Sequence, residues 1–191
     1  MLGDTIIYDI ETKDSFQEVG SRDAKKLHIS YIGMYSYNEN RLLGFTEEEF
    51  PLFWRRLESC ELLIGFNNHG FDDQVCSVYF PEMSKIASFD ILAEVHRNLG
   101  FRVKLDNLAG ATLGISKSGD GLRAIALYRE GKIDELASYC LDDVKITKDI
   151  YEYGKNNGKL LYKDLSGIKE VSVDFNQKVP KPEGSLNLSL F

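Results

Sequence analysis

Three short segments of the chain carry acidic side chains at spacings that suit metal chemistry. The first holds Asp9 and Glu11, at the end of the apolar run 5–10. Side chains alternate across a strand, so both carboxylates are expected to point to the same face. Two neighbouring carboxylates repel each other unless a cation lies between them, and Mg²⁺ prefers such oxygen ligands. An exposed strand end explains this pair equally well when it is taken alone.

The other two segments place a carboxylate on a helix. Residues 65–72 predict a strand, an Asn/Gly loop and a helix whose first turn carries Asp72. Asp is also a favoured N-cap residue, so Asp72 or its neighbour Asp73 could simply cap that helix. Tyr139 and Asp143 are four residues apart and therefore share one helix face. The alternative for this pair is a boundary tyrosine and a surface acid.

A sheet and several helices are needed to position these residues, and the apolar patterns predict both. Strands are predicted at 5–10, 29–37, 41–45, 61–66 and 85–89, the second and third joined as a hairpin. Helices are predicted at 46–57, 72–79, 91–99, 105–113 and 132–153, and a late edge strand around 171–175. This order indicates an α/β fold, with a mixed sheet of about five strands flanked by helices.

The composition is that of one globular domain. The chain has 191 residues, of which 43% are hydrophobic, and we expect a domain over 1–178 followed by a linker and tail over 179–191. The three cysteines are odd in number and lie among apolar residues, which favours buried thiols in a reducing compartment. The sequence has no apolar run of bilayer-spanning length and no basic signal-peptide start, so we expect no membrane partner and a cytoplasmic location.

The net charge of −7 weighs against nucleic-acid binding, because non-specific binders of polyanions are usually basic. A carboxylate site accounts for part of this charge, since a bound metal neutralises it. The charge is also uneven: residues 97–132 hold seven basic and three acidic side chains. That segment is equally consistent with a nucleic-acid contact and with a solvated helical surface.

Together, the three segments resemble the motifs of the DEDD exonucleases, tyrosine subclass, which have an RNase H-like fold. The second segment also resembles the second motif of family B polymerase proofreading domains. Residues 2–175 resemble stand-alone RNase H-like exonuclease domains of bacteria and phages. The stretches 104–109 and 131–162 are similar to the late helices of that family. Ser138 stands where the other DEDD subclass has histidine, which supports the tyrosine subclass.

The resemblance implies a metal-dependent 3′–5′ exonuclease that uses two divalent ions, Mg²⁺ or Mn²⁺. Asp9, Glu11 and Asp143 would ligate one ion, and Asp9 with Asp72 the second. Tyr139 would orient the attacking water, because a phenol with a pKa near 10 is poorly suited to act as a base. The implied substrate is the 3′ end of a single strand, with DNA favoured over RNA.

Further residues are candidates for contacts with substrate or partner. Asn67, Phe71 and Lys117 are candidates for substrate binding, and Phe101 and Tyr128 for stacking on bases, although aromatic residues are more often core. The tail residues Asn187, Leu188, Leu190 and Phe191 resemble a bacterial sliding-clamp-binding peptide, with Asn in place of Gln. The alternative functions are a catalytically silent module that binds nucleic acid or clamp, and a structure-specific endonuclease.

Overall fold

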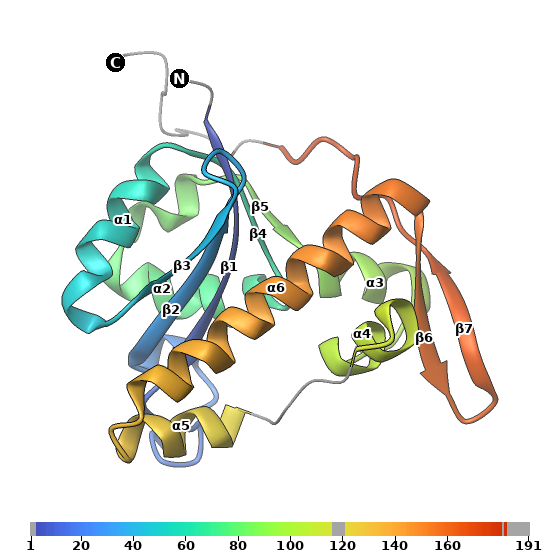
Figure 1. Ribbon diagram of the computed structural model, residues 1–191. Coiled ribbons are helices and arrows are strands. Elements are labelled where there is room, and N and C mark those ends of the chain that lie inside the picture. The colour runs from blue at the N-terminus through green and yellow to red at the C-terminus, as the bar shows by residue number, and fades with distance from the viewer. Residues whose placement is uncertain (1–2, 116–120, 181, 183–191) are drawn as a thin grey trace.

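Five strands form one mixed sheet in the order β3-β2-β1-β4-β5 (Figure 1). The computed structural model describes residues 3–115, 121–180 and 182. The strands are β1 Asp4–Thr12, β2 Ile29–Ser36, β3 Arg41–Phe45, β4 Cys60–Gly65 and β5 Ser88–Asp90. β2 runs antiparallel to β1 and β3, whereas β4 runs parallel to β1 and β5. The predicted fold, a five-stranded mixed sheet that begins with a strand and a hairpin, is confirmed.

Six α-helices flank this sheet within the described residues. They are α1 Phe50–Glu58, α2 Asp72–Tyr79, α3 Ile91–Leu99, α4 Leu105–Leu113, α5 Gly121–Arg129 and α6 Ile133–Asn157. Short 3₁₀ turns are η1 Ala24–Lys26, η2 Glu47–Glu49, η3 Asn68–Gly70 and η4 Pro81–Lys85. Thr46 and Glu49 form a capping box, which opens η2, so α1 begins later than the predicted helix 46–57. Helix α5 was not among the predicted helices.

The two faces of β1 enter different packing layers. Ile6, Tyr8 and Ile10 belong to the core under α1 and α2, whereas Ile7 packs in the core that includes α6. Figure 1 shows α6 lying across one face of the sheet, with α1 and α2 on the other. Because side chains alternate, Asp9 and Glu11 share the α6 face with Ile7.

Gly33 allows α6 to approach that face closely. Gly33 is the partner of Asp9 in the β1–β2 ladder. A Cβ atom at this position would lie 2.9 Å from the Cys140 sulfur and 3.0 Å from Val144 Cγ2. Both distances are shorter than ordinary van der Waals contacts, so any larger residue would displace α6 from the strand.

Two strand predictions are corrected by the structure. β6 Lys159–Asp164 and β7 Gly167–Ser172 form a separate two-stranded antiparallel sheet, where only one late edge strand around 171–175 was expected. In the middle of the chain, β5 is shorter and later than predicted, because Pro81 opens a 3₁₀ turn over the preceding residues.

In the described parts of the chain, no helix is long and apolar enough to cross a membrane.

Candidate metal centre

Asp72 lies against the end of β1 that carries Asp9 and Glu11. The β1–β4 pairing runs as far as Ile7 and Ile64, after which β4 gives way to the η3 loop. The backbone N–H of Ile10 donates a hydrogen bond to Asp72 Oδ1 at 3.1 Å. The N-cap position of α2 is Phe71, which makes no side-chain capping bond. Asp72 is therefore bound to β1 and does not cap its own helix.

Helix α6 covers the same strand end from the other side. Tyr139, Cys140 and Asp143 are all buried, with 6%, 0% and 4% exposure. The Cys140 sulfur lies 3.5 Å from the Asp9 carbonyl oxygen and 3.9 Å from Asp9 Oδ2. One donor atom each from Asp9, Glu11 and Cys140 lie within 4.8 Å of one another. The N-terminal half of α6 thus closes directly over the first acidic segment.

All four predicted carboxylates raise the pKa of a single thiol, that of Cys140. Burial raises the pKa of the Cys140 thiol well above its usual value, and the negative charges of four acids raise it further. In decreasing order of effect, these acids are Asp9, Glu11, Asp143 and Asp72. The printed contacts agree with this grouping, because Asp9 and Glu11 lie within 4.8 Å of Cys140, Asp143 follows Cys140 by three positions on α6, and Asp72 is hydrogen-bonded to the backbone of β1.

The Asp72 carboxyl is itself strongly perturbed. Burial, followed by the charge of Asp73, raises its pKa from 3.8 to about 7, although the hydrogen bond from Ile10 N opposes the shift. A raised carboxyl pKa means that negative charge is unfavourable at this place without a cation. The donor set fits a divalent ion, because carboxylate oxygens suit Mg²⁺ and Mn²⁺.

Sequence reasoning missed the position of Cys140. Its burial was predicted and is confirmed, since all three cysteines are free and buried. Its place beside Asp9 was not predicted, although it follows Tyr139 and precedes Asp143 by three positions on one helix. A thiol is a softer donor than a carboxylate and favours softer metals such as Zn²⁺ over Mg²⁺.

Tyr139 is packed into a small apolar cluster beside the carboxylates. The cluster joins β2, α5 and α6 through Tyr31, Ala124, Leu127, Leu136, Tyr139 and Cys140. Helix α5 therefore holds the N-terminal half of α6 in place. Ser138 and Asp142, the neighbours of the two predicted residues, are exposed.

The loop between β4 and α2 is anchored by two further acids. Asp73 accepts hydrogen bonds from the Tyr8 hydroxyl, from Asn68 Nδ2 at 3.3 Å and from Ser88 Oγ at 3.0 Å. The buried Asp90 accepts from the backbone N–H groups of Asn67 at 2.9 Å and His69 at 3.2 Å. These bonds fix the start of α2, and with it the position of Asp72.

Asp90 is also the N-cap of α3. Its Oδ1 accepts from the backbone N–H of Ala93 at 3.1 Å. The same carboxylate therefore joins the η3 loop to the first turn of α3.

The predicted substrate-binding residues differ in their surroundings. Asn67 has a left-handed backbone with φ of 67°, and its Oδ1 accepts a hydrogen bond from Arg102. Phe71 is half-buried and packs edge-to-face on Phe16, with ring centroids 5.9 Å apart. Lys117 and the four predicted clamp-binding residues lie outside the described part of the chain.

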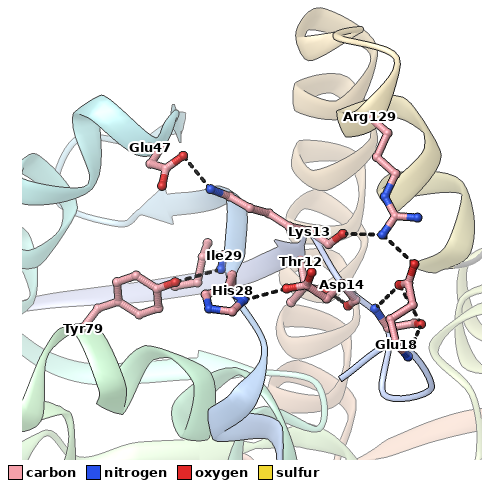
Figure 2. Close-up of polar contacts among 10 residues, drawn as sticks. Thr12, Lys13, Asp14, Glu18, His28, Ile29, Glu47, Tyr79 and Arg129 are labelled. Carbon is pink, nitrogen blue, oxygen red and sulfur yellow. Dashed lines mark hydrogen bonds and ion pairs between the residues drawn. The ribbon is translucent and has the colours of Figure 1, made fainter. Parts of the chain in front are cut away.

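The segment that follows β1 is held by ion pairs at the rim of the site (Figure 2). Lys13 Nζ lies 2.6 Å from Glu47 Oε2, and the Lys13 carbonyl oxygen accepts from Arg129 Nη2 at 3.1 Å. Arg129 also pairs with Glu18 at 2.7 Å. A groove of about 770 Å³ lies between this segment and α5. Both basic side chains are engaged by acids, so they link β1 to η2 and α5.

The sheet order and the acidic centre define an RNase H-like domain. The family model of the RNase H superfamily matches residues 6–154, which include all four carboxylates and Tyr139. The chain belongs to the RNase H superfamily. No curated protein matches its sequence.

Solved structures with the same fold include two nucleic-acid enzymes. The family B DNA polymerase from the hyperthermophilic archaeon Pyrobaculum calidifontis is 18% identical with a TM-score of 0.60, over 80% of this chain and 24% of the polymerase. The zinc-bound complex of Escherichia coli exonuclease I with single-stranded DNA is 14% identical with a TM-score of 0.54, over 81% of this chain and 41% of that one. The chain spans less than half the length of either protein, and at these identities the likeness concerns the fold.

Proposed function

We propose that the protein is a metal-dependent 3′–5′ exonuclease of the DEDD type, tyrosine subclass. The observation that carries the proposal is the grouping of acids at one end of β1: Asp9 and Glu11 lie within 4.8 Å of Cys140, on the same helix as Asp143, and Asp72 accepts a hydrogen bond from the Ile10 N–H at 3.1 Å. Such a cluster of buried negative charge is destabilising by itself. It is accounted for by a function that requires cations at this place.

Each residue has a distinct role in this proposal. Asp9, Glu11 and Asp143 would hold one divalent ion, and Asp9 with Asp72 a second. The chemistry that such ions supply when bound is activation of water and stabilisation of charge on a phosphate. Tyr139 would orient the attacking water by a hydrogen bond from its phenol. The close cover of α6 over β1 would limit access of bulk water to the acids.

Single-stranded DNA is the proposed substrate, ahead of RNA. The support is indirect: one structure with the same fold is exonuclease I bound to single-stranded DNA. A sliding clamp remains a proposed partner through the tail. A clamp pulldown tests this partner: deletion of residues 187–191 should reduce capture of the protein, and unchanged capture would contradict the proposal.

The test is cleavage of 5′-labelled single-stranded DNA and RNA with Mn²⁺, Mg²⁺ or EDTA. We expect metal-dependent shortening from the 3′ end, abolished by Asp143→Ala and only slowed by Tyr139→Phe. Asp142→Ala is a matched control, because Asp142 is the exposed neighbour on the same helix. Full activity of Asp143→Ala would overturn the assignment of the site.

The same assay separates the two alternative functions. Metal-dependent internal cuts, with no ladder from the 3′ end, would identify an endonuclease. Binding of the labelled strand without cleavage in either metal would identify a catalytically silent module.

A further inference from the structure

An exposed surface with aromatic and basic side chains lies on the C-terminal side of the domain, outside the metal centre. We call it the hairpin surface, and it consists of Phe101, Arg102, Tyr162 and Lys169. Phe101 is 49% exposed. The rings of Phe101 and Tyr162 meet edge-to-face with centroids 5.8 Å apart. In the β6–β7 ladder, Tyr162 pairs with Lys169, so these two side chains share one face of the hairpin, whereas the next pair, Lys163 and Ile168, points to the other face.

Side chains of α4 hold this hairpin in place. The amide of Asn107 donates to the Lys163 carbonyl at 2.8 Å and accepts from the Lys163 N–H at 2.7 Å. The Thr112 hydroxyl makes the same pair of bonds to Leu161, both at 2.9 Å. Asn107 and Thr112 thus act as a substitute strand along β6. The hairpin surface is therefore a fixed platform, on which a ligand loses little binding energy to ordering.

The hairpin surface is joined to the loop that positions Asp72. Arg102 donates a hydrogen bond to the side chain of Asn67, the residue before η3. Asn67 in turn is tied to Asp90 through its backbone N–H. A path of bonded residues therefore runs from Arg102, which follows Phe101, to the η3 loop before α2.

The charges on this surface are complementary to a polyanion, although the protein carries a net charge of −7. Arg102 and Lys169 are both exposed. Of the two acids on the hairpin, Glu170 pairs with Lys159 at 2.6 Å, and Asp164 accepts two hydrogen bonds from Ser166 and also interacts with Lys169. Arg102 follows Phe101 in the chain and Lys169 lies across the ladder from Tyr162, so both cations are neighbours of the pair of rings.

We propose that the hairpin surface binds the internal nucleotides of a single strand whose 3′ end occupies the metal centre. A base would stack on Phe101, and phosphates would contact Arg102 and Lys169. Stacking tolerates any base and cations follow the backbone, so the track would be independent of sequence. This inference rests on the proposed exonuclease function and adds where the strand lies.

The test compares cleavage of a long and a short substrate by the full chain. The variants are Phe101→Ala and Lys169→Glu. We expect each to raise KM about tenfold for a strand of about 20 nucleotides. Neither should change kcat/KM for a trinucleotide, which is too short to reach the hairpin. Leu165→Ala, on the same hairpin but outside the surface, and Lys26→Glu, on η1, are controls for apolar and charge effects.

Two results would overturn the inference: an unchanged KM for the long strand, or equal losses for both lengths. If the unmodified protein cleaves nothing, the proposed function fails and a binding measurement decides the hairpin surface separately. Fluorescence anisotropy of a labelled strand in EDTA should then show about tenfold weaker binding by Phe101→Ala. Equal binding by the variant and the unmodified protein would mean that the surface serves another partner, such as a protein.

Discussion

The acids on the two faces of β1 have opposite surroundings. On the face towards α6, Asp9 and Glu11 lie beside the buried thiol of Cys140, whose pKa they raise together with Asp143. On the face towards α1 and α2, Tyr8 donates its hydroxyl to Asp73, which also accepts from two other side chains.

The adjacent residues Asp72 and Asp73 separate these two uses. Asp73 accepts from three side-chain donors and holds the loop, whereas burial and then the charges of Asp73 and Asp90 raise the pKa of Asp72. An acid with several hydrogen-bond donors is a structural part of the fold. A buried acid with a raised pKa beside other acids is a candidate cation ligand.

The largest expected effects come from changing these two neighbours separately. Asp72→Asn should lower kcat by at least about a thousandfold while the fold is retained, as for other essential catalytic groups. Asp73→Asn should lower the free energy of unfolding by about 1–3 kcal/mol, because donors that now bind a carboxylate lose their charged partner. Activity and urea-unfolding measurements on both variants test the comparison. Equal effects on both quantities would show that the two acids share one role.

The raised pKa of Asp72 predicts a pH-dependent stability in the metal-free protein. Its pKa of about 7 in the folded state lies above the usual 3.8, so the neutral acid is favoured by folding. This contribution to the free energy of unfolding is complete below about pH 4. It is lost as the pH rises through about 7, which lowers the free energy of unfolding by up to a few kcal/mol. Urea midpoints in EDTA should therefore fall with pH, and Asp72→Asn should remove much of that fall. A fall that is identical in the variant would contradict this assignment.

Gly33→Ala tests whether the close approach of α6 assembles the site. The added Cβ would lie 2.9 Å from the Cys140 sulfur, so we expect a loss of about 1–3 kcal/mol in stability and a loss of activity. Gly110→Ala is the control, since its Cβ would meet only the Ile115 carbonyl at 3.7 Å. Adding Cys140→Ala should partly restore the stability of Gly33→Ala. If Gly33→Ala caused no loss of stability or activity, or if adding Cys140→Ala restored none of the loss, this contact would not control how closely α6 approaches β2.

The sequence predicts much of this site because its positions follow from local periodicity. Alternation along β1 places Asp9 and Glu11 on one face, and the helix that starts at Asp72 has the predicted bounds. Helical periodicity likewise predicts that Tyr139 and Asp143 share a face of α6. These relations depend only on residues close in the chain.

What the sequence does not predict depends on contacts between distant segments. The place of Cys140 beside Asp9 depends on how α6 crosses the sheet, which Gly33 permits but no local pattern reveals. β6 has a mixed, half-exposed pattern, and its outer edge is satisfied by Asn107 and Thr112. The strand predicted at 85–89 begins too early, because Lys85 still belongs to the 3₁₀ turn η4 and the paired part of β5 starts only at Ser88.

The central claim is that the acids of β1, α2 and α6 together bind divalent cations, and Mn²⁺ binding tests it most directly. Electron paramagnetic resonance titration counts bound Mn²⁺ without a substrate or any assumption about cleavage. We predict that the unmodified protein binds Mn²⁺, that Asp9→Asn and Asp143→Asn lose most of this binding, and that Asp73→Asn and Asp142→Asn keep it. Equal Mn²⁺ binding by Asp9→Asn and the unmodified protein would contradict the account.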